Sequence, residues 1–313
     1  MPSSAVRTFS EPDDYAAAIR AGTVEVIVTG RGQFAAKHVR IDFHHLWMQR
    51  VSDNLPRVWH SAIMPGIAGI WFYTQRGPGL VYGGVEIQAD QIVRPRGGEQ
   101  YYQVSSGPAC LGSMSLPMEE MESLGAIETG LTPPRHLSTV TPPPGAIEKL
   151  RRLHAAAGHM AENAPEIIAN PDAAYGLEQA LLGAMVNCFG SGEVREDSVA
   201  QRQHELIMRK FRRILEENPG EPLYIPEICK AIRVAGRTLR TCCQEHLGMG
   251  PKRYLLLRRL NLARQALRKA DPEATTVTKI ATEYGFWQLG RFAGEYQSLF
   301  GEPPSATLRG QSG

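Results

Sequence analysis

A dense group of basic side chains lies between residues 233 and 269. Ten of these 37 residues are Lys or Arg, and Glu245 is the only acid among them. The group consists of Arg233, Arg237, Arg240, Lys252, Arg253, Arg258, Arg259, Arg264, Arg268 and Lys269. Guanidinium groups form paired hydrogen bonds with phosphate oxygens and with guanine, whereas ammonium groups bind phosphate as point charges. So concentrated a group is not typical of an ordinary solvated face, and it predicts the recognition of a polyanion.

The basic group belongs to one half of the chain. Residues 201–313 contain 19 Lys and Arg residues and 11 Asp and Glu residues, whereas residues 1–200 contain 15 and 21. The whole chain of 313 residues has a formal net charge of only +2. This asymmetry indicates a mildly acidic module joined to a module that has a polyanionic partner.

Composition argues against several other classes of protein. With 42% hydrophobic and 21% charged residues, the chain is typical of a globular protein and not of a fibrous or disordered one. No apolar run approaches the ~18 residues of a membrane span, and the N-terminus lacks the pattern of a secretory signal. We therefore expect a cytoplasmic protein with no membrane partner. The chain has five cysteines, of which only Cys242 and Cys243 are close in sequence, and no CxxC pair; this favours reduced thiols over disulfides or a zinc site.

The sequence around the basic group repeats itself at an offset of 52 or 53 residues. The offset pairs Ile228 with Ile280 and Gly248 with Gly301. Each copy has the pattern of a short helix, a tight turn and a longer helix closed by Gly and Pro, which is the helix-turn-helix plan. The predicted helices cover residues 225–232, 236–247, 251–269, 277–284 and 288–300.

The predicted helix that joins the two copies has a length that suits DNA. Nineteen residues at ~1.5 Å each span roughly 28 Å, close to the ~34 Å between successive major grooves on one face of the duplex. Pro251, a favoured residue in a first helical turn, marks its start. A rigid helix of this length would hold two recognition helices in adjacent grooves.

A recognition helix reads base edges with its N-terminal and outward-facing side chains. In the first copy the residues that do not face the core are Arg237, Thr238, Arg240, Thr241 and Gln244. In the second copy they are Gln288, Gly290, Arg291, Gly294 and Gln297. Phosphate contacts are expected from Lys252, Arg253 and Arg309. Two alternatives, phosphate binding and packing within the joining helix, stay open for Arg258, Arg259 and Arg264.

Residues 200–309 resemble the DNA-binding domain of the AraC/XylS family of regulators. The segments that carry the resemblance include Arg237-Thr238-Leu239, His246-Leu247-Gly248-Met249-Gly250-Pro251, Arg258-Arg259-Leu260-Asn261-Leu262-Ala263-Arg264, Tyr284-Gly285-Phe286 and Leu299-Phe300-Gly301-Glu302-Pro303-Pro304. The resemblance implies a sequence-specific bacterial transcription factor, often an activator, that reads two consecutive major grooves. The family usually has Ser where this chain has Ala235, so we expect the first recognition helix to lack a side-chain N-cap hydrogen bond.

The N-terminal half has a different pattern. Short apolar runs separated by Gly and Pro over residues 24–116 predict strands of a sandwich or barrel, and helical periodicity begins at Ala146. The proline-rich residues 132–145 predict a stiff connector. The predicted fold class is therefore α+β. By resemblance to the family, its parts are a β-rich cupin-like sensor domain (1–145), linker and dimerisation helices (146–195) and an all-α double helix-turn-helix domain (196–313).

Three features of the N-terminal half bear on ligands and partners. The aromatic residues suit either an ordinary core or an apolar ligand pocket; they are Trp47, Trp59, Trp71, Phe72, Tyr73, Tyr82, Tyr101 and Tyr102. A second set suits either a dimer seam or packing against the sheet; it comprises Leu177, Ala180, Leu181, Ala184 and Met185. His44 and His45 are adjacent, so in a strand they would point to opposite faces. A cupin metal site contains a His-x-His pair, which this sequence lacks, so we expect no bound metal. We also expect no cofactor and no catalytic residue.

The leading interpretation is a non-enzymatic, homodimeric transcriptional regulator. Its expected partners are double-stranded promoter DNA, RNA polymerase and a small-molecule effector. A cupin-type enzyme fused to a DNA-targeting domain is one alternative, which bound metal in the purified protein would support. An architectural DNA-bending protein is another, and it would bind random and specific DNA with comparable affinity.

Overall fold

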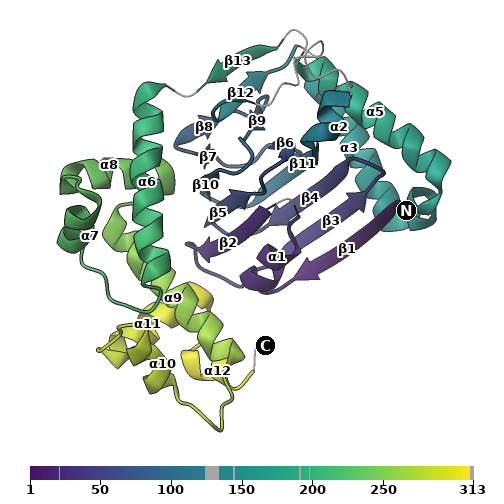
Figure 1. Ribbon diagram of the computed structural model, residues 1–313. Coiled ribbons are helices and arrows are strands. Elements are labelled where there is room, and N and C mark those ends of the chain that lie inside the picture. The colour runs from purple at the N-terminus through teal and green to yellow at the C-terminus, as the bar shows by residue number, and fades with distance from the viewer. Residues whose placement is uncertain (21, 124–133, 144, 190–191, 197, 311–313) are drawn as a thin grey trace.

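The computed structural model shows a β-rich N-terminal part beside a helical C-terminal part (Figure 1). The structure describes residues 1–20, 22–123, 134–143, 145–189, 192–196 and 198–310. Within these residues every strand precedes α6 (Val199–Glu217), and every regular element from α6 onward is a helix. The predicted order of a β-rich part followed by an all-α part is confirmed.

Two antiparallel sheets form the N-terminal part. The larger has the strand order β1-β3-β4-β11-β6-β9-β12-β13, and the smaller has the order β2-β5-β10-β7-β8. The larger sheet contains β1 (Ser3–Phe9), β3 (Ala36–Asp42), β4 (Trp47–Asp53), β6 (Ile67–Tyr73), β9 (Ile92–Arg94), β11 (Ala109–Pro117), β12 (Ser138–Thr141) and β13 (Glu193–Glu196). The smaller contains β2 (Gly22–Val28), β5 (Arg57–Ile63), β7 (Leu80–Tyr82), β8 (Val85–Ile87) and β10 (Gln100–Ser105). Side chains from both sheets line one cavity, so the sheets face each other.

Helices cover one face of the larger sheet (Figure 1). They are α3 (Ala146–Asn163), α4 (Pro165–Ala169) and α5 (Pro171–Phe189); two shorter helices, α1 (Pro12–Ala18) and α2 (Met118–Ser123), lie elsewhere in the N-terminal part. In α5, Leu181, Ala184 and Met185 are buried in the core that the helices share with the sheet, whereas Ala180 is exposed. For these three buried residues the structure shows packing against the sheet.

Two expectations for the N-terminal part are wrong. The predicted connector contains β12, because residues 138–141 carry no proline and their backbone pairs with both β9 and β13. Thr132, Pro133 and Pro144 of that connector lie outside the described residues. His44 and His45 lie in a bend after the end of β3 and not in a strand. There the His45 N–H donates a hydrogen bond to the Glu178 carboxylate at 2.8 Å.

The helices of the C-terminal part follow the predicted repeat closely. After α6 come α7 (Ile225–Ile232), α8 (Gly236–Leu247), α9 (Pro251–Lys269), α10 (Val277–Glu283), α11 (Leu289–Phe300) and α12 (Pro304–Leu308). The bounds of α7, α8 and α9 are the predicted ones. The second copy differs by one residue, since Tyr284 is the C-cap of α10 and Gln288 the N-cap of α11. The helix α9 contacts α8 of the first copy and both α10 and α12 of the second.

In both copies, the turn between the two helices contains a residue whose backbone lies in the left-handed region of φ/ψ space. Gly285 follows α10 with a φ of 74°, and Arg233 follows α7 with a φ of 57°. Glycine adopts this conformation readily, whereas it costs an arginine about 1–2 kcal/mol. The two positions correspond in the repeat, so the same turn geometry is kept even where the residue does not favour it.

The two parts of the molecule meet where β2 contacts α9. The Asn261 side chain accepts a hydrogen bond from the Val28 N–H at 3.1 Å and donates one to the Val28 carbonyl, also at 3.1 Å. Asn261 thus pairs with the end of β2 much as a neighbouring strand would. Nearby, Ile27, Val58 and Tyr102 share one apolar core with the C-terminal helices. A continuous core therefore runs from the smaller sheet into the helical part.

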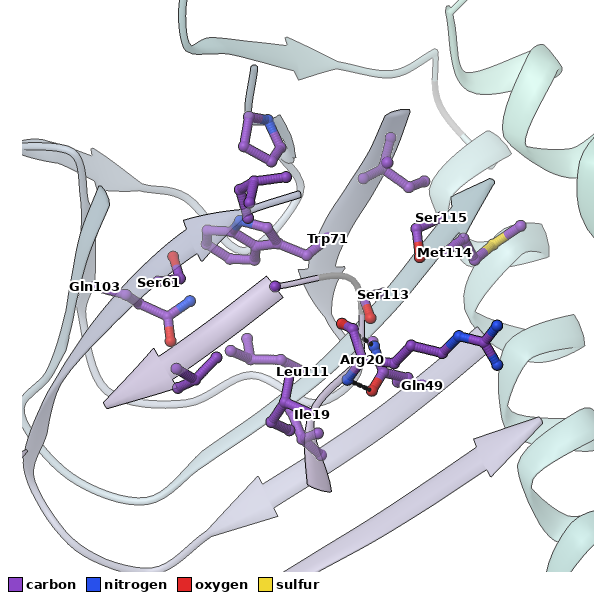
Figure 2. A pocket seen from close by; sticks show the side chains of 18 of the residues that line it. Ile19, Arg20, Gln49, Ser61, Trp71, Gln103, Leu111, Ser113, Met114 and Ser115 are labelled. Carbon is purple, nitrogen blue, oxygen red and sulfur yellow. Dashed lines mark hydrogen bonds between the residues drawn. The ribbon is translucent and has the colours of Figure 1, made fainter. Parts of the chain in front are cut away.

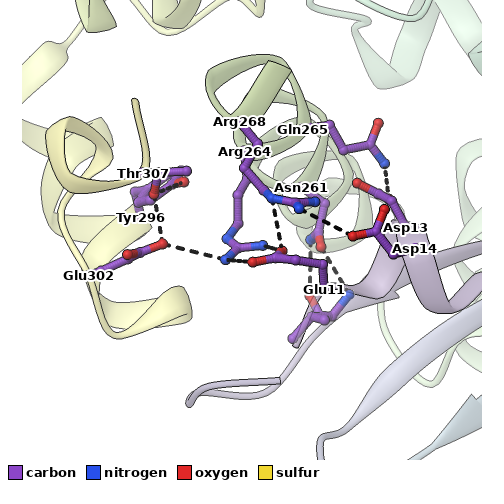
Figure 3. A network of polar contacts seen from close by, with 11 residues as sticks. Glu11, Asp13, Asp14, Asn261, Arg264, Gln265, Arg268, Tyr296, Glu302 and Thr307 are labelled. Atoms are coloured by element: carbon purple, nitrogen blue, oxygen red, sulfur yellow. Dashed lines mark hydrogen bonds and ion pairs between the residues drawn. The ribbon is translucent and has the colours of Figure 1, made fainter. Parts of the chain in front are cut away.

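Ion pairs extend this contact along α9 (Figure 3). The Arg264 guanidinium donates hydrogen bonds to both carboxylate oxygens of Glu11. Arg268 lies 3.4 Å from the Glu11 carboxylate and 3.3 Å from that of Asp14. The acidic residues around α1 therefore neutralise the C-terminal half of α9.

Another acidic residue, Glu25, lies close to an arginine in the middle of the same helix. The Glu25 carboxylate of β2 pairs with the buried Arg212 of α6 and lies 3.9 Å from Arg258 of α9. Arg259 lies over the Phe286 ring at 4.9 Å from its centroid. Of the two alternatives for Arg258, Arg259 and Arg264, the structure shows packing inside the protein.

Replacing Asn261 with Ala should lower the free energy of unfolding by about 2 kcal/mol, because it leaves the buried Val28 N–H and carbonyl without their partner. Urea unfolding followed by circular dichroism measures the change. Lys269→Ala, an exposed change on the same helix, is the control and should shift stability by less than ~0.5 kcal/mol. Equal unfolding midpoints for N261A and the unmodified protein would show that the contact between β2 and α9 does not form in solution.

Candidate nucleic-acid interface

The first recognition helix, α8, has one buried and one exposed face. Its core side chains are those of Leu239, Cys242, Cys243, His246 and Leu247. Arg237, Arg240, Thr241 and Gln244 are exposed, and Thr238 is half-buried. Ala235 makes no side-chain cap bond, as predicted. The structure therefore brings the five predicted residues to the solvent side of α8.

The C-terminal end of α8 contacts the N-terminal part of the molecule. The His246 ring lies against Gly84, where a Cβ atom would come within 2.8 Å of the imidazole Nε2. Burial lowers the pKa of His246 to about 4 and raises the pKa of Cys242 to about 11. Both side chains are therefore neutral at pH 7, and the positive charge of α8 lies on its exposed face.

The second recognition helix, α11, is arranged in the same way. Phe292, Tyr296, Leu299 and Phe300 are buried. The predicted outward residues Gln288, Gly290, Arg291, Gly294 and Gln297 are all exposed. Arg291 is engaged with Glu295, the two groups being 3.0 Å apart. The exposed face of α11 thus offers fewer unpaired polar groups than that of α8.

Two exposed residues at the start of α11 were missed by the sequence reasoning. Trp287 is 73% exposed and Leu289 is 38% exposed. Periodicity places large apolar side chains in the core, and for that reason neither was counted as outward. The sequence did contain a signal for the exposure of Trp287 and Leu289. Phe286 and Phe292 flank these two residues and fill the core positions, and both are buried.

The basic group divides into two sets. Arg258, Arg259, Arg264 and Arg268 contact other protein groups, so the expectation that the whole group faces a polyanion is too broad. The remaining six, none of which forms an ion pair within the described residues, are exposed; they are Arg233, Arg237, Arg240, Lys252, Arg253 and Lys269. Arg309, the C-cap of α12, is exposed as well.

A separate hollow lies between the two sheets (Figure 2). Its volume of about 120 Å³ has room for roughly ten water molecules. Trp59, Trp71 and Tyr82 are the aromatic residues of its wall. Of the predicted aromatic set, Phe72, Tyr73, Tyr101 and Tyr102 are buried without lining it. Some members of the aromatic set therefore line a cavity and others belong to an ordinary core, and ligand binding by the cavity stays a prediction.

The wall of this cavity is mainly apolar and carries a few polar groups. Within the described residues, Trp59 Nε1, Gln103 Oε1 and Ser115 Oγ are buried without a hydrogen-bond partner. Arg20 is the charged residue of the wall. Its guanidinium is paired with the Asp42 carboxylate and lies over the Trp47 ring. The cavity thus offers hydrogen bonds but no unpaired charge among the described residues.

The described residues contain no group of three or more His, Cys, Asp or Glu side chains that could hold a metal ion. None of their helices is both long and apolar enough to cross a membrane.

The chain is similar to known regulators in its C-terminal part. A family model described as a helix-turn-helix domain matches residues 228–310. A probable thc operon regulatory protein of Rhodococcus erythropolis is 41% identical over 103 residues, which are 33% of this chain and 31% of that protein. The XylDLEGF operon transcriptional activator of Pseudomonas putida is 37% identical over 95 residues, or 30% of each chain. The match thus spans about a third of the length of these relatives.

Two solved structures resemble most or all of the chain at low similarity. The AraC-like transcriptional activator CuxR matches with a TM-score of 0.45 and 14% identity, over 84% of this chain and 96% of that one. ToxT from Vibrio cholerae matches with a TM-score of 0.32 and 12% identity, over 100% of this chain and 99% of that one.

The affinity of the full-length protein for DNA should fall ~10³-fold or more between 50 and 200 mM salt, since contacts with six or more phosphates release that many counterions. Fluorescence anisotropy at several salt concentrations measures the slope. Lys252→Gln should reduce the slope by about 1, because it removes an exposed cation. Arg268→Gln, whose guanidinium is engaged with Glu11 and Asp14, is the matched control and should leave the slope unchanged. A flat salt response would contradict the assignment of this surface.

Proposed function

We propose that the protein is a DNA-binding transcriptional regulator of the AraC/XylS family, because its C-terminal part matches a helix-turn-helix family model and is similar to known operon regulators. The observation that carries the proposal is α9, a single 19-residue helix that contacts both helix-turn-helix units. Each unit exposes the outward face of its recognition helix. Held in this way, α8 and α11 would enter two adjacent major grooves of one duplex.

The exposed faces of α8 and α11 differ, so the two helices would contribute differently to base recognition. Arg237, Arg240 and Gln244 of α8 are hydrogen-bonding groups suited to guanine and adenine edges. Lys252 and Arg253 in the first turn of α9, together with Arg309, would bind phosphates and so set the register. The first unit would therefore carry most of the discrimination that depends on hydrogen bonds.

Partners and regulation belong to the same proposal. The proteins named as operon activators among the relatives support activation, which requires contact with RNA polymerase. We expect a cytoplasmic homodimer that assembles through the part before residue 190 and has no catalytic role. The proposed division of the chain is a sensor domain (1–145), linker helices (146–195) and the DNA-binding domain (196–313).

The cavity between the sheets is the proposed effector site. Its ligand would be a small uncharged molecule, because a charged group there would have no free counter-charge and its burial would be costly. Trp59 Nε1 can donate a hydrogen bond to such a ligand, and Gln103 Oε1 can accept one.

Strand β2 offers a route from this site to the DNA-binding helices. Successive side chains of a strand point to opposite faces, and Val24 lines the cavity whereas Glu25 and Ile27 contact the helical part. A ligand that shifts β2 would therefore move the contacts of Val28 with Asn261 on α9. Two positions of β2, one with and one without ligand, would give the two states that regulation requires.

A footprint tests the central function. Full-length protein on the DNA upstream of its own gene should protect two segments centred about 10–10.5 base pairs apart on one face. Random DNA of the same length is the control and should bind at least ~10³-fold more weakly. Comparable affinity for both DNAs would favour the architectural alternative and contradict sequence-specific regulation.

Pairs of similar probes test the chemistry of the effector site. Benzamide and benzyl alcohol are neutral, and benzoate and benzylamine are their charged counterparts. At equal millimolar concentration we expect the neutral members to raise the melting temperature and to change the fluorescence of Trp59 and Trp71. Trp59→Phe removes the indole donor and should weaken this binding. Stabilisation by the charged members alone, or by none of the four, would contradict the proposed ligand class.

A further inference from the structure

The start of α11 presents an apolar surface to solvent. Trp287 is 73% exposed and Leu289 is 38% exposed, although both side chain types are usually buried. They lie at the N-terminal end of the recognition helix, the end that approaches base edges in a helix-turn-helix unit. Two exposed apolar side chains at this end of a recognition helix are therefore placed to contact base edges.

Two glycines make the same helix unusually narrow on its outward side. Each glycine inside a helix costs about 1 kcal/mol relative to alanine. A Cβ atom added to Gly290 or to Gly294 would meet nothing within 4 Å. Packing inside the protein therefore does not require either glycine. This differs from Gly285, where Pro222 and Arg259 lie within 3.1 Å of such a Cβ. Because positions 290 and 294 carry no side chain, an external partner can come close to the backbone of α11 there.

The outward residues of α11 include three hydrogen-bonding side chains, Gln288, Arg291 and Gln297, against five on α8. Arg291, the one outward arginine of α11, is paired with Glu295 at 3.0 Å. The exposed face of α8, in contrast, carries Arg237 and Arg240, which form no ion pair among the described residues. In the major groove, the base feature that an apolar surface can recognise is the 5-methyl group of thymine.

We propose that α11 recognises thymine methyl groups in the second major groove, with Trp287 and Leu289 as the apolar contacts. Gly290 and Gly294 let the helix backbone come close enough for these contacts to form. The inference rests on the proposed function, since it assigns a base preference to one of the two recognition helices. The proposal predicts that the second half-site is rich in thymine at the positions that face the N-terminal end of α11.

Substituting deoxyuridine for thymine isolates this interaction, because uracil keeps the hydrogen-bonding groups of thymine and lacks only its 5-methyl group. We expect the affinity of the full-length protein to fall roughly fourfold for each contacted methyl group in the second half-site, from the transfer free energy of one methyl group. The same substitution at thymines outside both half-sites is the control and should have little effect. Anisotropy titrations with matched duplexes measure both.

Variants of the protein connect the methyl effect to the named residues. Trp287→Ala and Leu289→Ala should weaken binding to the thymine duplex and reduce the difference between the thymine and deoxyuridine duplexes. Arg240→Ala should weaken binding and leave that difference intact. Gly294→Ala should raise the melting temperature, because the helix gains propensity and nothing blocks the methyl group, yet it should lower the affinity for DNA.

The outcomes separate the two proposals. If no sequence-specific DNA binding is found, the proposed function fails. If specific binding is found but the second half-site lacks thymine, or deoxyuridine binds as well as thymine, only the methyl recognition is overturned. It is also overturned if W287A binds both duplexes like the unmodified protein but activates transcription less, which would make Trp287 a contact for RNA polymerase.

Discussion

The docking of α9 onto β2 is the contact on which the rest of the structure depends. Asn261 pairs with both backbone groups of Val28, and Glu11 and Glu25 neutralise arginines along the helix. A buried guanidinium that loses its partner costs several kcal/mol, so these carboxylates fix the position of α9 against the sheet. The same helix contacts both helix-turn-helix units. The N-terminal part therefore determines where the two recognition helices lie.

This contact also determines which cations remain exposed. The arginines at 258, 264 and 268 are charged in the sequence but are used inside the molecule. The exposed cations of the basic group lie at the C-cap of α7, on α8 and at the ends of α9, and the polar face of α8 contrasts with the apolar start of α11. The two units thus follow one repeated plan but expose different side chains: hydrogen-bonding groups in the first, and Trp287 with two glycines in the second.

Local patterns predicted the helical repeat well and the tertiary contacts poorly. The bounds of α7, α8 and α9 follow from helical periodicity with Gly and Pro at the ends, which are signals between neighbouring residues. The partner of Arg264 is Glu11, which lies 253 positions away, and no periodicity reveals such a pair. Strand β12 was hidden among prolines because its pairing with β9 and β13 overrides local propensity. Trp287 was missed because hydrophobicity predicts burial, whereas this side chain is 73% exposed.

The spacing of the two half-sites tests the role of α9 most directly. A continuous helix fixes the distance between the recognition helices, so inserting either 5 or 10 base pairs between the half-sites should reduce the affinity of the full-length protein to that for one half-site. A 5-base-pair insertion moves the second half-site to the opposite face of the DNA, whereas 10 base pairs keep it on the same face but farther away. If the 10-base-pair insertion restores the affinity of the original site, the two units move independently and α9 does not hold them as one rigid reader.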